Sequence, residues 1–267
     1  MLATLQRSRT RNGAAYLETG AGEPLLLIHG VGMRLEAWGP QIAAFSNTHR
    51  VIAINMPGHG GSERIASDAK LDGFVAWLAA VIDDLGLDSV NVAGHSMGAL
   101  IAGGIAATQP HRVRRVALLN GVYRRSPDAR AAVLARAAEI SDGQIDHDGP
   151  LLRWFGEDSQ NTEAYRLTRS WLSDVDPQGY ATAYSAFAEG DALYADWWPS
   201  VLCPALFLTG ADDPNSTPAM AMAMADAAPH GYFRLIENER HMVNLTAPVA
   251  VNAIMREWLA REAPERL

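Results

Sequence analysis

Cysteine is almost absent from this sequence, which has one, Cys203, among 267 residues. A single thiol cannot form an internal disulfide, so a reducing compartment, the cytoplasm, is expected. Cys203 precedes a proline and an apolar run, where a buried and inert thiol is expected. No Cys/His spacing is typical of a metal site, and no glycine pattern is typical of a phosphate or dinucleotide loop. The sequence therefore predicts neither a metal ion nor a cofactor.

Long apolar runs and clusters of positive charge are also missing. The longest apolar stretch, 97–107, is about half of a membrane span. Residues 1–13 contain arginines but no apolar segment of the kind found in signal peptides. The formal net charge is −8, and no group of lysines and arginines indicates a nucleic-acid surface. These absences predict a soluble protein that binds a small-molecule substrate, with no nucleic acid and no membrane, and they leave the oligomeric state open.

The most informative segment is Gly94-His95-Ser96-Met97-Gly98. An apolar run precedes it and small residues follow it, so a strand is expected to turn sharply into a helix at Ser96. This is the G-x-S-x-G pattern of a nucleophile elbow, in which the glycines leave room for a strained turn. The Ser96 hydroxyl is the candidate nucleophile, and the N–H of Met97 is a candidate oxyanion donor. His95 is expected to be structural, with substrate contact as the alternative.

Apolar runs and helical patterns alternate along the first 120 residues. The runs lie at 24–28, 50–55, 90–93 and 113–120, with helical patterns at 37–45, 71–85 and 99–107. This order predicts an α/β fold with a mostly parallel central sheet and helices on both faces. Ligands of such sheets bind beyond the carboxyl ends of the strands. Val31 follows the first run, and its N–H is the second candidate oxyanion donor; a simple turn is the alternative.

The alternation breaks near Tyr123. Residues 124–200 combine helical patterns with many aromatic residues, which predicts an inserted helical lid on a core formed by 1–123 and 201–267. A lid over a parallel sheet has an underside that faces the pocket. The residues expected to line the pocket are His95, Trp154, Trp171, Tyr184 and Trp197. The alternative is a helical subdomain whose aromatic rings fill only its own core.

The alternation resumes after this segment, with apolar runs at 205–209 and 232–236. Asp212 and Asp213 follow the first of these runs, and His241 follows the second. Neighbouring side chains point in different directions, so only one aspartate can reach the histidine. Pro214 restricts the backbone of Asp213 and favours it as the acid, while Asp212 remains the alternative.

Taken in order, these motifs resemble the α/β-hydrolase family, and the resemblance covers nearly the whole chain. The motifs are His29-Gly30, Gly58-x-Gly60-x-Ser62, the elbow at Ser96, Gly210-x-x-Asp213 and His241. The chain looks most like lid-bearing small esterases, proteins similar to 3-oxoadipate enol-lactonase, and C–C bond hydrolases. The resemblance implies that Ser96 is the nucleophile, His241 the general base and Asp213 its orienting acid, with Val31 and Met97 as oxyanion donors.

Three positions depart from the family pattern without touching the triad. Asn55 stands where many relatives have aspartate, Ala99 where glycine is frequent, and Thr246 where glutamate is frequent. A serine at the elbow excludes the epoxide hydrolases and haloalkane dehalogenases of this fold, which use aspartate there.

The function implied by the resemblance is hydrolysis of a carboxylic ester or lactone of small to medium size through an acyl-enzyme. The alternatives are C–C bond cleavage of a vinylogous diketone, and acyl transfer or perhydrolysis on the same triad. A binding protein that has lost catalysis is a third possibility. Fold resemblance does not identify the substrate.

Overall fold

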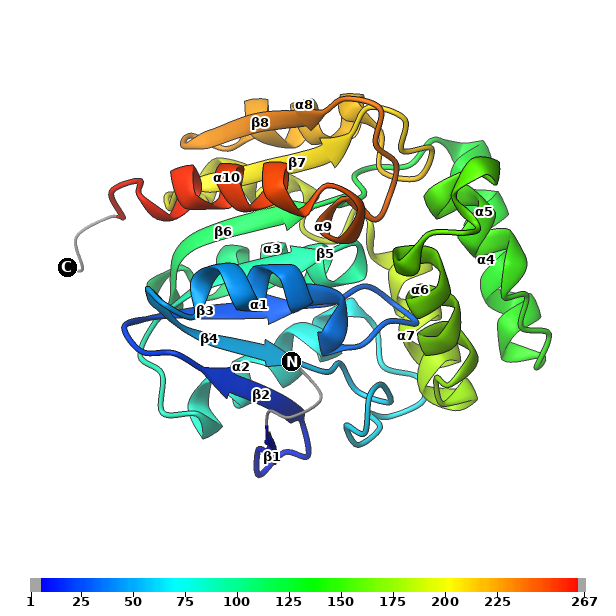
Figure 1. Cartoon of the computed structure of the whole chain (residues 1–267), viewed down its shortest axis with the longest axis horizontal. Coiled ribbons are helices and arrows are strands. Elements are labelled where there is room, and N and C mark those ends of the chain that lie inside the picture. Colours follow the sequence, from blue (N-terminus) through cyan, green and yellow to red (C-terminus); the bar gives the residue numbers. More distant parts are fainter. Residues whose placement is uncertain (1–5, 264–267) are drawn as a thin grey trace.

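The computed structural model describes residues 6–263 and contains an eight-stranded sheet in the order β1-β2-β4-β3-β5-β6-β7-β8 (Figure 1). The strands are β1 (Arg7–Arg9), β2 (Ala15–Thr19), β3 (Glu23–Ile28), β4 (His49–Ile54), β5 (Val90–His95), β6 (Val113–Leu119), β7 (Ala205–Gly210) and β8 (Gly231–Ile236). Strands β3 to β8 pair in parallel, whereas β2 is antiparallel to both β1 and β4. The sheet is therefore mostly parallel, as predicted.

Side chains of the central strands divide between two apolar cores, one on each face of the sheet. In β3, Leu26 and Ile28 belong to the larger core, and Leu25 and Leu27 to the smaller one. All four are fully buried. Because helices cover both faces, neither set of alternating side chains meets water. This explains why the strand has an uninterrupted apolar sequence.

Helices α1 (Gly39–Phe45) and α10 (Pro248–Leu259) cover the face with the smaller core. The opposite face carries α2 (Leu71–Asp84), α3 (Met97–Thr108) and α8 (Pro218–Ala227) (Figure 1). Short helices η2 (Leu35–Trp38), η3 (Pro110–Arg112) and α9 (Val243–Thr246) lie in the connections. Helix α2 buries Leu71, Phe74, Val75, Leu78 and Ile82, the stripe that its helical spacing predicts.

A group of helices, called here the inserted helices, lies between β6 and β7. They are α4 (Pro127–Ser141), α5 (Asp148–Phe155), η4 (Glu157–Ser159), α6 (Glu163–Ser173), α7 (Pro177–Gly190) and η5 (Ala195–Ser200). Figure 1 shows α4 to α7 beyond the carboxyl ends of the parallel strands. Ion pairs from Arg64 to Asp176 and from Lys70 to Glu189 join α7 to the core of the fold.

The strands β1 and β2 had no counterpart in the sequence-based expectation. In β2 the side chains alternate between buried and partly exposed, and in β1 all are exposed, so neither forms an apolar run. The predicted core segments 1–123 and 201–267 also include residues 1–5 and 264–267, which lie outside the described residues.

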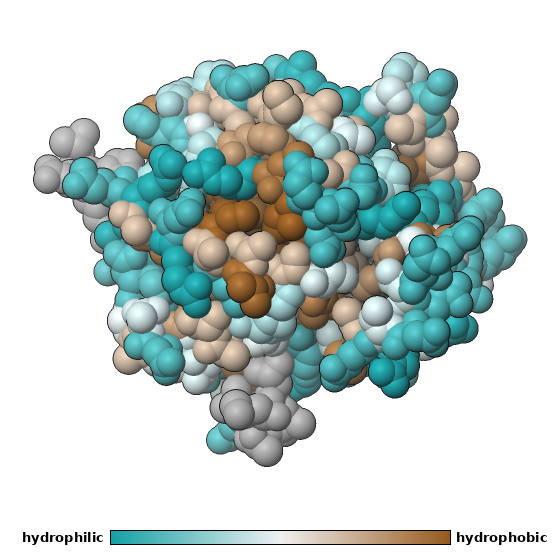
Figure 2. Space-filling view, turned by 45° about the horizontal axis from the view of Figure 1, so that its top comes forward, coloured by the Kyte–Doolittle hydropathy of each residue, from teal (hydrophilic) through white to brown (hydrophobic). Residues whose placement is uncertain are grey.

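Figure 2 shows a mostly hydrophilic surface over the inserted helices, at the right of the view. Apolar residues gather nearer the centre of the view. The inserted helices bury some of their larger apolar side chains, among them Trp154, Phe155, Tyr165 and Leu172, and leave others exposed, such as Leu152 and Trp197. Within residues 6–263, no helix has both the length and the apolar content that crossing a membrane requires.

Candidate active site

The turn between β5 and α3 places Ser96 in a strained backbone conformation, with φ 54° and ψ −115°. A Cβ on Gly94 would lie 1.9 Å from the carbonyl oxygen of Gly98, and one on Gly98 would lie 2.2 Å from that of Ile28. Side chains at these positions would therefore break the turn. The Ser96 hydroxyl lines a cavity and makes no hydrogen bond to any other described residue. It is thus available to a bound ligand.

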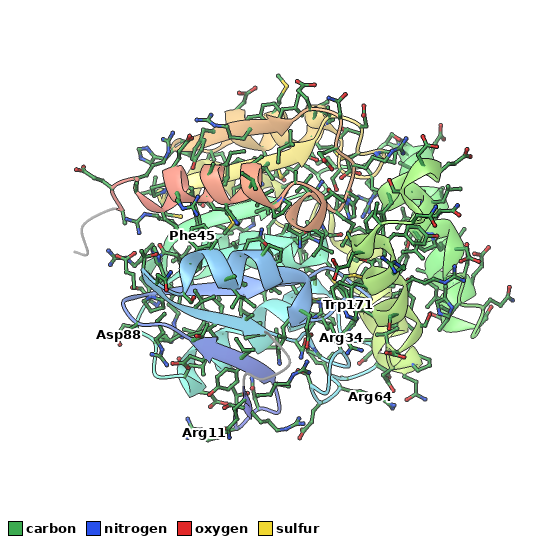
Figure 3. The ribbon with its side chains drawn as sticks, viewed as in Figure 1. Arg11, Arg34, Phe45, Arg64, Asp88 and Trp171 are labelled. Atoms are coloured by element: carbon green, nitrogen blue, oxygen red, sulfur yellow. The ribbon has the colours of Figure 1, made fainter. Side chains whose placement is uncertain are left out.

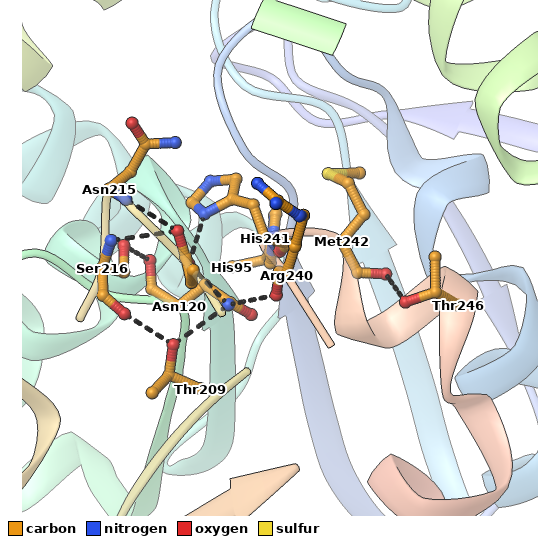
Figure 4. A network of polar contacts seen from close by, with 10 residues as sticks. His95, Asn120, Thr209, Asn215, Ser216, Arg240, His241, Met242 and Thr246 are labelled. Atoms are coloured by element: carbon orange, nitrogen blue, oxygen red, sulfur yellow. Dashed lines mark hydrogen bonds and ion pairs between the residues drawn. The ribbon is translucent and has the colours of Figure 1, made fainter. Parts of the chain in front are cut away.

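His241 and Asp213 meet beyond the ends of β8 and β7. The His241 Nδ1 to Asp213 Oδ2 distance is 2.7 Å, and both side chains are buried (Figure 4). The other Asp213 oxygen accepts hydrogen bonds from the N–H groups of Asn215 and Ser216. Burial opposes ionisation of Asp213, but the charge of His241 and these hydrogen bonds keep its pKa below the usual value. Asp213 is therefore an anion that is hydrogen-bonded to the imidazole ring of His241.

Asn120 also holds the Asp213 carboxylate, a role that sequence reasoning missed. Its amide nitrogen donates to Asp213 Oδ2 at 2.8 Å and lies 3.2 Å from the carbonyl oxygen of Arg240 (Figure 4). Its backbone φ of 50° is in the left-handed region, which asparagine tolerates better than most residues. The signal in the sequence was its position directly after β6, at the same edge as Ser96.

The backbone N–H groups of Val31 and Met97, the predicted oxyanion donors, have no hydrogen-bond partner within residues 6–263. Met97 is the first residue of α3, where N–H groups lack a partner within the helix. The N–H of Val31 has no partner among the described residues.

Two buried histidines hold the loop that carries Val31: His29, from the His29-Gly30 motif, and His59, which lies within the Gly58-x-Gly60 motif. Their hydrogen-bonding roles were not predicted from the sequence. His29 Nε2 accepts from the N–H of Met56, and His59 Nε2 accepts from the N–H of Gly32, each at 3.0 Å. The remaining ring nitrogens pair with carbonyl oxygens of neighbouring residues. Both rings must be neutral to accept these bonds, and burial lowers the pKa of each, that of His59 to about 4.

A cavity of about 340 Å³ lies between these residues and the inserted helices. Ser96, His241 and Val31 line its core side, and Trp154 and Tyr184 line the side formed by the inserted helices. The ring of Trp154 stacks on that of His241 at a centroid distance of 5.9 Å. The backbone carbonyl oxygen of Trp154 also accepts a hydrogen bond from the backbone N–H of His241. The structure thus brings together the predicted residues Ser96, His241, Val31, Trp154 and Tyr184.

His95 does not line this cavity. Its ring lies behind His241, with centroids 5.0 Å apart, and its Nε2–H donates to the carbonyl oxygen of His241 at 2.8 Å. His95 therefore has a supporting position, because its hydrogen bond holds the backbone of His241 and its side chain is not part of the cavity lining.

Two predicted pocket residues on the inserted helices also lie elsewhere. Trp171 lines a separate surface depression together with Arg34 and Arg64, and Figure 3 shows these three at the junction of core and inserted helices. Trp197 is 47% exposed and packs edge-on against Tyr194. Aromatic density in the sequence does not give the direction of each ring, because that depends on how the helices pack.

Three arginines line the cavity and were not anticipated: Arg125, Arg136 and Arg153. They come from the segment before α4, from α4 itself and from α5. The only signal in the sequence was the presence of arginines within an aromatic-rich segment, and arginines are common on exposed helix faces.

We expect the free energy of unfolding to fall as the pH is lowered from 6.5 towards 4. Burial lowers the pKa of His59 to about 4 and that of His95 to about 3, whereas unfolded histidine titrates near 6.5. In this window the unfolded chain binds protons that the native chain does not, so acid favours unfolding. Each histidine should lower the free energy of unfolding by about 2 kcal/mol between pH 7 and pH 5. Urea unfolding at both pH values measures the change, and equal stabilities would contradict neutral, buried rings.

The model of the alpha/beta hydrolase fold family matches residues 23–171. The chain belongs to this family, and it is an enzyme of the hydrolase class. It is 54% identical over 256 residues to the (E)-2-((N-methylformamido)methylene)succinate hydrolase of Acinetobacter baylyi. The alignment covers 96% of this chain and 97% of that protein.

Two solved structures share the fold and 26% of the sequence. The enol-lactonase from Burkholderia xenovorans LB400 superposes with a TM-score of 0.84 over 96% of this chain and 100% of that one. A thermophilic esterase from Thermogutta terrifontis, with malate bound, has a TM-score of 0.85 over 95% of this chain and 98% of that one.

Proposed function

We propose that this chain is a serine hydrolase in which Ser96 attacks the carbonyl carbon of a small acyl substrate. The observation that carries the proposal is the 2.7 Å hydrogen bond from His241 to Asp213, made by a histidine that lines the same cavity as Ser96. A carboxylate can only accept, so Nδ1 carries the proton and the Nε2 lone pair of the neutral ring is left free. A general base for Ser96 requires this tautomer.

In the first half of the reaction, Ser96 Oγ bonds to the carbonyl carbon while its proton moves to His241 Nε2. The carbonyl oxygen becomes an oxyanion, which the N–H groups of Val31 and Met97 stabilise. The bond to the leaving group then breaks, and the leaving group takes the proton from His241. In the second half, His241 deprotonates a water that attacks the acyl-enzyme, and the acid product departs as Ser96 regains its proton.

We propose that residues 124–200 form a lid on the core formed by 1–123 and 201–267. Trp154 and Tyr184 close the cavity opposite Ser96, and Trp154 also contacts the ring of His241. Ion pairs of α7 with the core support a closed position. Such a lid would exclude water from the reacting carbonyl, which strengthens the oxyanion contacts.

The bond that is cleaved belongs, in this proposal, to an ester, a lactone or an N-acyl amide. A cavity of about 340 Å³ suits a small acyl compound. The relative from Acinetobacter baylyi is named for an N-formyl derivative of succinate, and the solved structures include an enol-lactonase and an esterase. These compounds share a carbonyl carbon that carries a leaving group, so the same steps apply to each. C–C bond cleavage of a vinylogous diketone remains the alternative.

A panel of substrates tests the proposal. It contains (E)-2-((N-methylformamido)methylene)succinate, p-nitrophenyl acetate and a vinylogous diketone produced by ring fission. We expect kcat/KM for the succinate compound to exceed that for the acetate ester by about 100-fold or more, because polar groups of the substrate add contacts in the cavity. Release of formate and of p-nitrophenol is the measurement. Turnover of the diketone alone would assign C–C bond hydrolysis instead.

A further inference from the structure

Positive charge is concentrated in the part of the cavity lining that residues 124–200 contribute. Three arginines line the cavity, Arg125, Arg136 and Arg153, and its lining contains no aspartate or glutamate. A cavity that is to hold a neutral acyl group needs no such charge. The hydrogen bonds and ion pairs of each guanidinium group show which arginines are available to bind a ligand.

The positive charge of Arg125 is paired with a carboxylate of the protein. Its guanidinium lies 3.3 Å from Asp191, and both side chains are almost fully buried. It also donates to the carbonyl oxygens of Phe187 and Ala188 and lies over the Phe187 ring at 4.4 Å. These contacts give Arg125 a structural role, since they fix the segment before α4 against α7.

Arg136 and Arg153 have no carboxylate partner within 4.0 Å among the described residues. Arg136 donates one hydrogen bond, to the hydroxyl of Tyr184 at 3.1 Å. Arg153 makes no hydrogen bond and no ion pair to any described residue. Asp146 acts on both from a greater distance, and its own carboxylate accepts from backbone N–H groups of α5. Two half-buried cations therefore face the cavity without a counter-charge in contact.

This arrangement carries an electrostatic cost in the free protein. Burial lowers the pKa of Arg153, and the neighbouring charge of Arg136 lowers it further. Arginine nevertheless stays protonated at neutral pH. Burial of a charge without a partner is unfavourable, so an anion bound in contact with both guanidinium groups would offset this cost.

We propose that Arg136 and Arg153 form a carboxylate-binding site, so that the enzyme takes anionic substrates, with dicarboxylates as the preferred class. The inference rests on the proposed function, because it places the reacting carbonyl at Ser96 and the carboxylates at Arg136 and Arg153. The planar guanidinium group matches a carboxylate through two parallel hydrogen bonds. Two such groups fit either the two carboxylates of one substrate or one carboxylate held from both sides.

Equilibrium binding tests the site without catalysis. Methylenesuccinate, a dicarboxylate that carries no ester or amide, is titrated calorimetrically into the wild-type protein and into Arg136→Met, Arg153→Met and Arg166→Met. Arg166 is a matched control, because it is an exposed arginine of α6 outside the cavity. We expect each cavity variant to raise Kd about tenfold or more and the control to change it less than about twofold. Equal binding by all four proteins, or none by the wild type, would overturn the proposal.

A pair of esters tests the same site during turnover. Monomethyl succinate and methyl butyrate differ by a carboxylate in place of a methyl group. In Arg153→Met we expect kcat/KM for the succinate half-ester to fall about 10- to 100-fold, mainly through KM, while that for methyl butyrate stays within about threefold. Arg153→Lys should recover part of the loss. The unchanged neutral ester shows that the variant is folded.

Two results separate failure of this inference from failure of the proposed function. Equal losses on both esters would mean that Arg153 supports the fold or the catalytic groups, and would overturn the carboxylate site. If neither ester is cleaved but methylenesuccinate binds the wild type and not the variants, the site stands and the proposed ester chemistry fails.

Discussion

Replacing Ser96 by alanine is expected to lower kcat by about four powers of ten or more while the protein remains folded. Loss of Oγ removes the atom that forms the acyl-enzyme, and His241 cannot compensate because it has no nucleophile to deprotonate. Alanine adds no bulk to a side chain that makes no hydrogen bond among the described residues. Measurement of kcat on the best substrate of the panel, with circular dichroism as the folding control, gives the result.

Labelling provides a second test of the same residue. A fluorophosphonate probe should add one adduct to the wild-type protein, at Ser96, and none to Ser96→Ala. Retention of more than a few per cent of the activity in Ser96→Ala, or labelling at another serine, would remove Ser96 from the mechanism.

Asp213→Asn is expected to lower kcat about ten-thousandfold, whereas Asp212→Asn should change it less than about tenfold. An amide at position 213 can present its N–H₂ to His241 Nδ1, which would favour the tautomer with the proton on Nε2. That tautomer cannot accept the proton of Ser96. Asp212 is exposed and provides a matched control, because the same change is made one residue away. Both values of kcat are measured on one activated ester.

The opposite order of effects would transfer the orienting role to Asp212. Similar small effects in both variants would mean that His241 keeps its tautomer without a carboxylate. Asn120 offers a further comparison, since its amide donates to Asp213 Oδ2, the same oxygen that His241 contacts. Its removal should cost less than the loss of Asp213 itself.

The sequence by itself was sufficient for the alternation of parallel strands and helices along the chain and for the elbow at Ser96. Both depend on local patterns: uninterrupted apolar runs, helical spacing, and glycines at positions where a side chain would collide with the backbone. Parallel strands end at one edge of the sheet, so residues that follow β5, β7 and β8 are brought together by the fold class alone. For this reason Ser96, Asp213 and His241 could be placed at one site without coordinates.

Only the tertiary structure decided what surrounds these residues. The contact of Asn120 with Asp213 joins positions 93 residues apart, and that of His95 with the His241 carbonyl oxygen joins positions 146 apart. Trp154 faces the cavity while Trp171 and Trp197 do not, although all three belong to the same aromatic-rich segment. Periodicity shows which side of a helix is apolar, but the partner of each side chain depends on how helices pack against one another. Arg136 and Arg153 became recognisable as arginines without an ion-pair partner only when packing showed that no carboxylate among the described residues lies within 4.0 Å of them.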